Sequence, residues 1–464
     1  IKREDLQQVF SFKIRGAYNK MSSLNAKQRS EGVLCASAGN HAQGLAQAAK
    51  LMGVKATIVM PVTTPEIKIA SVRSRGAKVV LFGDTFNDAL SHALLLEKQR
   101  NLHFIHPFDD PEIIAGQGTV AMEIVHQHSA KIDAVFVPVG GGGLIAGIAA
   151  YIKYVRPDTQ VIGVEYEESA SLAAAMAAGR RVRLKQVGIF ADGIAVAQVG
   201  EHTWPLMKKY VDDVITVSSD EICAAVKDIF DDTRVIAEPA GAVSVAGMKK
   251  YVEAKKCSGQ TLVTISTGAN ANFDRLRYVT ERAEVGEQRE AILAVTIPER
   301  QGAFKKFVTV LGKRLITEFN YRRDDADSAR IFLGIKIANR EEKEQIIAQL
   351  ETAHYAVLDL TDNELAKTHI RHMVGGKASG AQNETLTRFE FPERPGALAD
   401  FLTLLGARWN ITLFHYRNHG AAYGRVLAGM QVPKGEARAF KDSLAQLNYR
   451  HWDESSNEAY SLFL

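Results

Sequence analysis

The chain has 464 residues, of which 46% are hydrophobic and 24% charged, and its net charge is +4. This length is enough for about three domains of a globular protein. The interspersed charges form no basic face for nucleic acid, and no uninterrupted apolar stretch approaches the roughly 18 residues of a membrane span. Three cysteines without disulfide or metal-ligand spacing suit a reducing compartment. We expect a soluble cytoplasmic protein.

The first segment with a candidate catalytic residue is Ser11-Phe12-Lys13-Ile14-Arg15-Gly16-Ala17. Ser11 is predicted to cap a helix, which places Lys13 in the first turn, where the positive helix end disfavours an ammonium group. Phe12 and Ile14 are expected to exclude water from it. A lysine whose pKa is lowered in this way is nucleophilic near neutral pH. The competing interpretation is a lysine that merely begins a helix.

A second candidate segment, Ser37-Ala38-Gly39-Asn40-His41-Ala42-Gln43-Gly44, follows a short predicted strand over 33–36. It opens a helix that Gly53 is predicted to end. Its hydroxyl, amide and backbone donors are of the kind that hold a small carboxylate. Taken alone, the segment is equally typical of a capped helix start.

Four consecutive glycines, Gly140-Gly141-Gly142-Gly143, lie between a predicted strand over 134–139 and a predicted helix that starts near Leu144. Without Cβ atoms this backbone can turn sharply and direct successive N–H groups at one anion, and the positive end of the following helix adds to the attraction. The run therefore predicts a phosphate-binding loop.

Two phosphate compounds compete for this loop. The pattern Gly141-x-Gly143-x-x-Ala146 fits a tolerant dinucleotide fingerprint, and Glu165 closes the next predicted strand about 20 residues on. Against a dinucleotide, the run lies in mid-chain after several α/β units. The alternative is pyridoxal 5′-phosphate, which needs one phosphate cup and a lysine elsewhere for its aldehyde.

Two later segments add polar groups. Ala237-Glu238-Pro239-Ala240-Gly241-Ala242 precedes a helix, and Glu238 is a candidate site residue or only part of a turn. Ser266-Thr267-Gly268-Ala269-Asn270 presents a hydroxyl after the apolar run 262–265. Loops beyond the carboxyl ends of parallel strands are where α/β sheets bind ligands.

The strands expected over 56–60, 78–82, 134–139 and 161–165 alternate with helical stretches, which is typical of a parallel, doubly wound α/β domain.

Taken in this order, the lysine, asparagine, tetraglycine and Ser-Thr-Gly-Ala-Asn segments resemble the fold-type II, tryptophan-synthase-β-like family of pyridoxal phosphate enzymes. Within it they are most similar to the threonine deaminases. The resemblance implies a catalytic domain over 1–273, and the start at Ile1 without Met indicates that an N-terminal part of it is missing.

The resemblance also implies roles for individual residues. Lys13 would be the catalytic lysine that binds the cofactor aldehyde, with Phe12 near the ring and Asn40 on the ring's 3′-oxygen. Thr267 would face the pyridine nitrogen. The other implied contacts are Gly140, Gly141, Gly142, Gly143 and Leu144 for the cofactor phosphate, and Ser37, Ala38, Gly39, Asn40 and His41 for the substrate carboxylate.

The implied reaction converts L-threonine, and also L-serine, with pyridoxal 5′-phosphate as cofactor. Lys13 would remove the α-proton and the β-hydroxyl would leave, so that L-threonine yields 2-oxobutanoate and ammonia. This is the first committed step of isoleucine biosynthesis. A serine dehydratase, a β-replacement enzyme that uses O-acetylserine, and a non-catalytic amino-acid sensor remain alternatives. A nicotinamide oxidoreductase is less favoured.

The last third of the chain contains an internal repeat. Ile297-Pro298-Glu299-Arg300-Gln301-Gly302-Ala303-Phe304 returns 94 residues later as Phe391-Pro392-Glu393-Arg394-Pro395-Gly396-Ala397-Leu398, and Asn320-Tyr321-Arg322 is echoed by His415-Tyr416-Arg417 with a slip of one residue. Two copies of one unit follow, at 291–375 and 385–464, after a connecting helix within 274–290.

The repeat resembles ACT-like regulatory domains with β-α-β-β-α-β order. The resemblance implies a homotetramer whose effectors, isoleucine and valine, bind at turns that include Gly302, Phe304, Gly396 and Leu398. An oligomerisation platform is the alternative. The spaced histidine pairs His103/His106, His369/His372 and His415/His419 have no third ligand nearby in sequence, and we expect no metal site.

Overall fold

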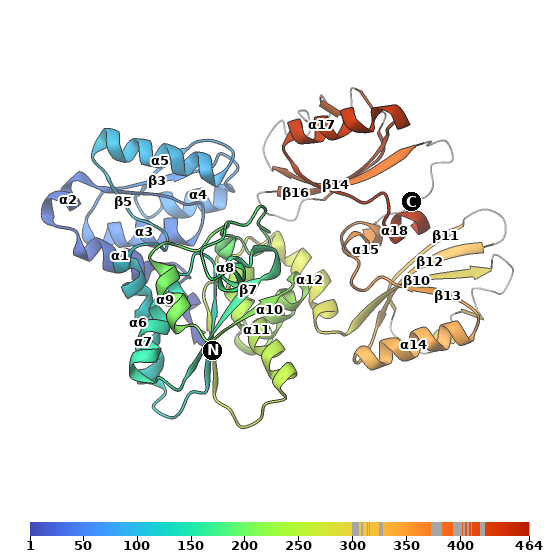
Figure 1. The fold of residues 1–464 in the computed structure, drawn as a ribbon, viewed down its shortest axis with the longest axis horizontal. Helices are drawn as coiled ribbons and strands as arrows, with labels where there is room; N and C mark the ends of the chain where they lie inside the picture. Colours follow the sequence, from blue (N-terminus) through green and yellow to red (C-terminus); the bar gives the residue numbers. More distant parts are fainter. Residues whose placement is uncertain are drawn as a thin grey trace. The chain divides into compact units, whose positions relative to one another are not determined.

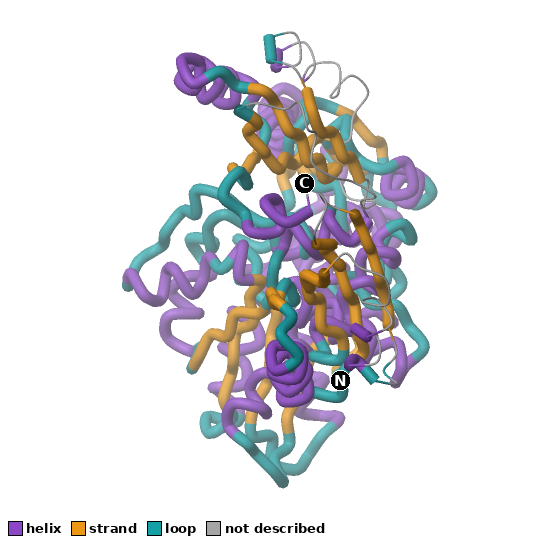
Figure 2. The backbone as a smooth tube through the Cα atoms, turned by 90° about the vertical axis from the view of Figure 1, so that its right-hand side faces the viewer, coloured by secondary structure: helices purple, strands orange, loops and turns teal. Residues whose placement is uncertain are grey.

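The computed structural model describes residues 1–298, 306–307, 310–312, 314, 316–323, 328–372, 383–392, 401, 404–405, 408–409, 411–417 and 423–463. The chain forms two compact units, Ile1–Phe273 and Asp274–Leu464. In each unit the strands of a sheet run side by side with helices packed against them (Figure 2).

The first unit contains two parallel sheets. The larger has the strand order β1-β9-β6-β7-β8 and the smaller β4-β3-β2-β5, and every strand pair in both is parallel. The predicted α/β class is thereby confirmed. The strands are β1 Lys2–Arg3, β2 Val33–Ala36, β3 Ala56–Met60, β4 Lys78–Leu81, β5 His103–Phe104, β6 Ala134–Pro138, β7 Gln160–Tyr166, β8 Asp213–Val217 and β9 Leu262–Ser266.

Helices cover both faces of each sheet because side chains of successive strand residues point to opposite faces. Helices α6 to α9 share an apolar cluster with one face of the larger sheet, and α11 packs on its other face, where Tyr251 meets Phe136 edge-on. On the smaller sheet, α1, α3 and α4 cover one face and α5 the other (Figure 1). The helices are α1 Lys13–Ser23, α2 Ala26–Glu31, α3 Asn40–Met52, α4 Glu66–Arg73, α5 Phe86–Arg100, α6 Pro111–Gln127, α7 Gly143–Val155, α8 Ser171–Ala178, α9 Thr203–Tyr210, α10 Ser219–Thr233 and α11 Pro239–Lys255.

Four of these helices, α1, α3, α6 and α7, pack with their backbones in contact at glycines. A Cβ on Gly116 would lie 2.7 Å from the Cα of Gly16, joining α6 to α1. A Cβ on Gly147 would lie 2.7 Å from the amide nitrogen of Gly118, joining α7 to α6, and one on Gly44 would lie 3.0 Å from the backbone of Lys13. No side chain larger than hydrogen fits at Gly116 or Gly147 without moving a helix.

The second unit contains two antiparallel sheets of the same topology, β11-β12-β10-β13 and β15-β16-β14-β17. This strand order is that of ferredoxin-like domains and confirms the predicted ACT-like fold. The first helix expected in each repeat falls largely on residues outside the described set. The strands are β10 Glu290–Pro298, β11 Ile316–Arg323, β12 Ser328–Lys336, β13 Ala356–Asp359, β14 Glu384–Pro392, β15 Ile411–Arg417, β16 Tyr423–Gln431 and β17 Arg450–Asp453.

The pairing of the strands follows the sequence repeat. Leu293 of β10 lies opposite Leu333, and Thr387, 94 positions further along, lies opposite Ala428, which is 95 positions beyond Leu333. The one-residue slip seen in the sequence therefore falls between the first and third strands of the repeat.

One face of each sheet in this unit is covered by a long helix, α14 Arg340–Thr352 or α17 Ala437–Leu447. The opposite faces share an apolar cluster with α15 Glu364–Thr368 and α18 Glu458–Phe463 (Figure 1).

Segment 274–290, expected to connect the two halves, forms α12 Arg275–Gly286 and packs within the second unit, where buried Arg282 pairs with Glu364. In the part of the chain that the structure describes, no helix is both long and apolar enough to cross a membrane.

Candidate active site

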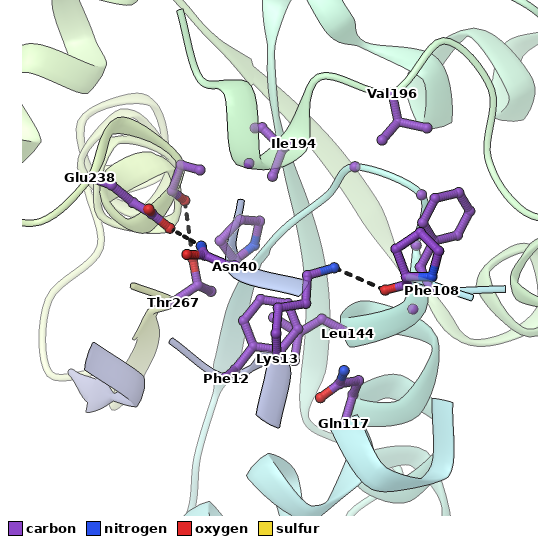
Figure 3. A pocket seen from close by; sticks show the side chains of 18 residues that line it. Phe12, Lys13, Asn40, Phe108, Gln117, Leu144, Ile194, Val196, Glu238 and Thr267 are labelled. Carbon is purple, nitrogen blue, oxygen red and sulfur yellow. Dashed lines mark hydrogen bonds between the residues drawn. The ribbon is translucent and has the colours of Figure 1, made fainter. Parts of the chain in front are cut away.

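A cavity lies in the first unit, where loops and helix N-termini from both sheets meet (Figure 3). All of the residues predicted from the sequence to bind the cofactor line it. Glu238, Asn40 and Thr267 lie on one side of Lys13, and Phe108 lies on the other. The lining consists of Phe12, Lys13, Asn40, Pro107, Phe108, Gln117, Pro138, Gly140, Gly141, Gly142, Gly143, Leu144, Gly193, Ile194, Val196, Glu238, Ala240 and Thr267.

Lys13 is the first residue of α1, as expected, but the predicted cap is wrong. The N-cap is Phe12 in the helical conformation, and no side chain caps the helix. Ser11 instead forms a β-bridge with Gly268, and its buried hydroxyl has no partner among the described residues. Because Phe12 N also donates to Thr267 O at 3.2 Å, the entry to α1 is fixed by β9 and its following loop rather than by a local cap.

The Lys13 amine is desolvated within the cavity. Its Nζ donates to the carbonyl of Pro107 at 3.0 Å. Burial lowers the pKa of Lys13 to about 8, although the nearby Glu238 carboxylate acts in the opposite direction. A pKa of about 8 leaves roughly a tenth of the amine neutral at pH 7, against well under a thousandth for an ordinary lysine. The residue is therefore suited to nucleophilic and base chemistry.

The glycine loop accepts only glycine. A Cβ on Gly141 would lie 2.3 Å from the ring of Phe108, and one on Gly140 would lie 2.9 Å from the Cα of Ile194. Gly142 has a φ of +93°, which side chains rarely adopt, and it is the N-cap of α7. The first N–H groups of a helix have no partner within it and carry its positive end, so this cradle fits a phosphate group.

Glu165, which a dinucleotide would need for its ribose, is used elsewhere. It is fully buried and accepts hydrogen bonds from the amides of Leu172 and Ala173, both at 2.8 Å, at the start of α8. Burial raises the pKa of its carboxyl to about 7. A carboxyl group that holds a helix N-terminus is not free to bind ribose, which disfavours the dinucleotide alternative.

Asn40 is held from two sides. Its Nδ2 donates to Glu238 Oε1 at 2.5 Å, and its Oδ1 accepts from Asn270 Nδ2 at 2.7 Å. Glu238 is thus both the N-cap residue of α11 and a cavity residue. Asn270 was not selected from the sequence, although it ends the quoted Ser266–Asn270 segment. Thr267 Oγ1 donates to the carbonyl of Ala240 at 3.2 Å, and Thr267 also lines the cavity.

The other residues expected to bind substrate lie beside the cavity rather than in its lining. Ser37 Oγ accepts from the amide of Gly39 at 3.2 Å, and Ala38 lies between them. His41 is buried with its Nε2 2.8 Å from the carbonyl of Ile105, and burial lowers its pKa to about 3. A Cβ on Gly39 would meet nothing within 4 Å, so the backbone of this loop borders open space.

Sequence reasoning did not assign the loop 106–110 to the site; it considered only His106, as a metal ligand, and rejected it. The loop supplies the Pro107 carbonyl that accepts from Lys13 and the Phe108 ring that packs on the glycine loop. His106 Nδ1 accepts from the amides of Phe108 and Asp109, and burial lowers its pKa to about 4. Only the proline and the aspartates after a strand mark this loop in the sequence, and such a signal is too general to indicate a site.

Gly302, Phe304, Gly396 and Leu398, the expected effector residues, lie outside the described residues. Among those described, no group of three or more His, Cys, Asp or Glu side chains could hold a metal ion.

Comparison with known proteins gives two family matches. Residues 1–268 match the family "Pyridoxal-phosphate dependent enzyme", and residues 281–370 and 375–464 each match "C-terminal regulatory domain of Threonine dehydratase". The donor set fits that cofactor, because a phosphate cradle and a desolvated lysine line one cavity.

Individual relatives agree with these matches. The chain is 55% identical to "L-threonine dehydratase biosynthetic IlvA" of Burkholderia multivorans over 100% of this chain and 92% of that protein. Among solved structures, the processed form of threonine deaminase isoform 2 from Solanum lycopersicum aligns with a TM-score of 0.60 at 50% identity, covering 61% of this chain and 82% of that one. Serine racemase from Dictyostelium discoideum aligns with a TM-score of 0.54 at 33% identity, covering 58% and 87%. The chain belongs to the biosynthetic threonine dehydratases, a family of pyridoxal-phosphate-dependent enzymes with a C-terminal regulatory domain.

Proposed function

We propose that this protein converts L-threonine into 2-oxobutanoate and ammonia, as the first committed step of isoleucine biosynthesis. One observation carries the proposal: a buried lysine with a pKa of about 8 shares a cavity with a helix-terminal glycine loop and with Asn40. The identity of 55% to a biosynthetic threonine dehydratase over the whole chain supports threonine as the substrate.

The cofactor, when bound, supplies the aldehyde that takes up the amino acid and the ring that accepts electrons from its α-carbon. The amides at the start of α7 bind its phosphate, and the Asn40 side chain, fixed by Glu238 and Asn270, orients the ring. Thr267 would face the ring nitrogen with a neutral hydroxyl, which favours a protonated nitrogen much less than a carboxylate would.

Lys13 acts as the base that removes the α-proton of the substrate. Its lowered pKa keeps a useful fraction of the amine neutral at neutral pH. Phe108, Leu144 and Ile194 line the cavity with apolar groups and exclude water from the reacting carbon. The open backbone of Ser37, Ala38 and Gly39, next to Asn40 and His41, receives the substrate carboxylate.

L-serine is the second candidate substrate, because a 33% identical structure, a serine racemase, shares the fold. The test is 2-oxoacid formation from L-threonine, L-serine and O-acetylserine at matched concentrations. We expect turnover with L-threonine to exceed that with L-serine, and O-acetylserine to yield no replacement product with added sulfide. A preference for L-serine would reassign the substrate, and inactivity with all three would indicate a sensor.

We further propose that isoleucine inhibits this activity and that valine opposes the inhibition, through the two ACT-like repeats of a cytoplasmic homotetramer. The match of both repeats to a regulatory domain supports this assignment. The same assay with either effector, and with both together, tests it. Sedimentation measurements test the tetramer, and unchanged turnover at saturating isoleucine would contradict the regulatory role.

A further inference from the structure

We propose that Thr203 is a positioning residue that orients the phosphate-binding loop through its hydroxyl group and thereby sets the affinity for the cofactor phosphate. Thr203 lies outside the cavity lining, and its role rests on three sets of contacts in the first unit.

The first set fixes one carbonyl of the loop. Thr203 is fully buried at the first residue of α9, and its Oγ1 donates to the carbonyl of Gly141 at 2.8 Å. The amide of Gly200 donates to the same oxygen at 3.1 Å. Two donors therefore hold the Gly141 carbonyl on the side of the loop where α9 begins.

The geometry of the peptide bond connects the position of the Gly141 carbonyl with the binding of phosphate. In a trans peptide the carbonyl of one residue and the N–H of the next point in opposite directions. Holding the Gly141 carbonyl toward Thr203 directs the Gly142 N–H to the opposite side, where the cavity lies. Because glycine rotates freely about its backbone bonds, this peptide plane needs an external restraint.

The second set holds Thr203 itself in place. The carboxylate of Asp109 accepts hydrogen bonds from the amides of Glu201 at 2.7 Å, His202 at 2.7 Å and Thr203 at 3.3 Å. A negative charge at a helix N-terminus is favourable, so Asp109 anchors the start of α9. In the same loop, Pro107 accepts a hydrogen bond from Lys13 and the Phe108 ring packs on Gly141. One loop therefore contacts both the lysine and the phosphate-binding glycines.

The third set packs the loop closely against the start of α9. A Cβ on Gly142 would lie 2.6 Å from the Met207 side chain and 3.0 Å from Thr203 Oγ1, and a Cβ on Gly200 would lie 2.3 Å from Asp109. The loop, the turn before α9 and the first turn of α9 are thus packed against one another. Removing the hydroxyl takes away one of the two donors that hold the Gly141 carbonyl and leaves this packing in place.

The experiment compares two cofactor forms, pyridoxal 5′-phosphate and pyridoxal, which lacks the phosphate. Binding to cofactor-free protein is followed by the visible absorbance of the lysine-bound form and by equilibrium dialysis. In Thr203→Val, which keeps the side-chain shape, we expect the affinity for the phosphate form to fall about 2- to 13-fold, the range of one lost hydrogen bond. The affinity for pyridoxal should change by less than about twofold.

Two further variants separate positioning from general damage. Thr203→Ser keeps the hydroxyl and should restore phosphate-form affinity to near that of the parent. Thr159→Val removes a matched hydrogen bond, from a buried threonine Oγ1 to the Ile132 carbonyl at 2.8 Å, away from the cavity, and should alter neither affinity.

Equal weakening of both cofactor forms in Thr203→Val, or parental affinity for both, would overturn the proposal. If Thr203→Val does not fold, Asp109→Asn provides the same comparison, and it should weaken phosphate-form binding selectively. No arm uses threonine turnover, so an error in the proposed substrate would leave this test unaffected.

Discussion

Both units of this chain are built from sheets and helices, but they differ in the direction of their strands. In the first unit every strand is parallel, so the carboxyl ends of the strands in a sheet lie along one edge, and the helix N-termini that follow them meet at one cavity. In the second unit neighbouring strands are antiparallel, so the carboxyl ends of neighbouring strands lie at opposite edges of each sheet. Parallel order concentrates backbone N–H groups for anion binding, whereas the repeated antiparallel units build two similar sheets around shared apolar clusters.

The comparison predicts that chemistry depends on the first unit alone. Replacing Lys13 with Ala removes the nucleophile and the base together, and we expect the turnover of L-threonine to fall by about 10³-fold or more. The measurement is the initial rate of 2-oxobutanoate formation. Equilibrium dialysis should still detect the cofactor, because the glycine loop is intact. Near-normal turnover would show that another group acts as the base.

A shortened chain tests whether regulation by isoleucine depends on the second unit. A protein ending at Phe273 should still deaminate L-threonine but should not respond to isoleucine. The cut belongs there rather than at residue 290, because α12 packs within the second unit. In the full chain a coupling of 1–3 kcal/mol would change threonine affinity about 5- to 150-fold on isoleucine binding. Retained isoleucine sensitivity in the shortened protein, measured by rates across isoleucine concentrations, would place the effector site in the first unit.

Substitution of Thr267 tests the charge at the ring nitrogen. Thr267→Asp introduces a carboxylate that favours a protonated nitrogen, and we expect deamination of L-threonine to slow about tenfold, the effect of roughly one pKa unit, with more transamination. Product analysis by chromatography measures the partition. Thr267→Ser retains the hydroxyl and is the matched control, with an unchanged partition expected. An unchanged partition in Thr267→Asp would mean that the residue does not face the nitrogen.

The smallest expected effects are changes in the free energy of unfolding caused by breaking one ion pair in each unit. The hydrogen bond from Arg15 lowers the pKa of Glu123 from 4.5 to about 2. Burial raises the pKa of Glu364, but the charge and hydrogen bond of Arg282, together with the charges of Lys367 and Arg388, outweigh burial and bring the pKa to about 2. Both folded values lie below the unfolded value, so each pair stabilises its unit fully above about pH 4.5, and the contribution is lost as the pH falls toward 2.

Glu123→Gln and Glu364→Gln should each cost about 1 kcal/mol at pH 7, since both carboxylates are partly exposed. Denaturant unfolding, read separately for the two units, should show each variant destabilising its own unit, with a smaller loss at pH 3. A variant that destabilised both units equally would indicate that they unfold together.

Sequence patterns predicted the elements whose signals are local. Strands over 33–36 and 56–60 and the helix end at Gly53 have the predicted bounds, because apolar runs and a left-handed glycine mark them directly. The Ser11 cap was wrong because a bridge to Gly268, more than 250 residues away, decides the conformation there. Pro107, Asp109 and Thr203 could not be found, because their importance arises from contacts between segments distant in sequence.

The glycine contacts between helices have a consequence for how this protein can change by mutation. Lys13 and the phosphate loop lie at the starts of helices whose spacing is set by Gly16, Gly116, Gly118 and Gly147. At these positions the helix backbones approach each other with no side chain between them. Adding one carbon atom at Gly116 or Gly147 would separate two helices and alter the distance between amine and phosphate in the same step. Selection can therefore remodel the walls of this cavity far more freely than it can adjust the separation of its two anchoring points.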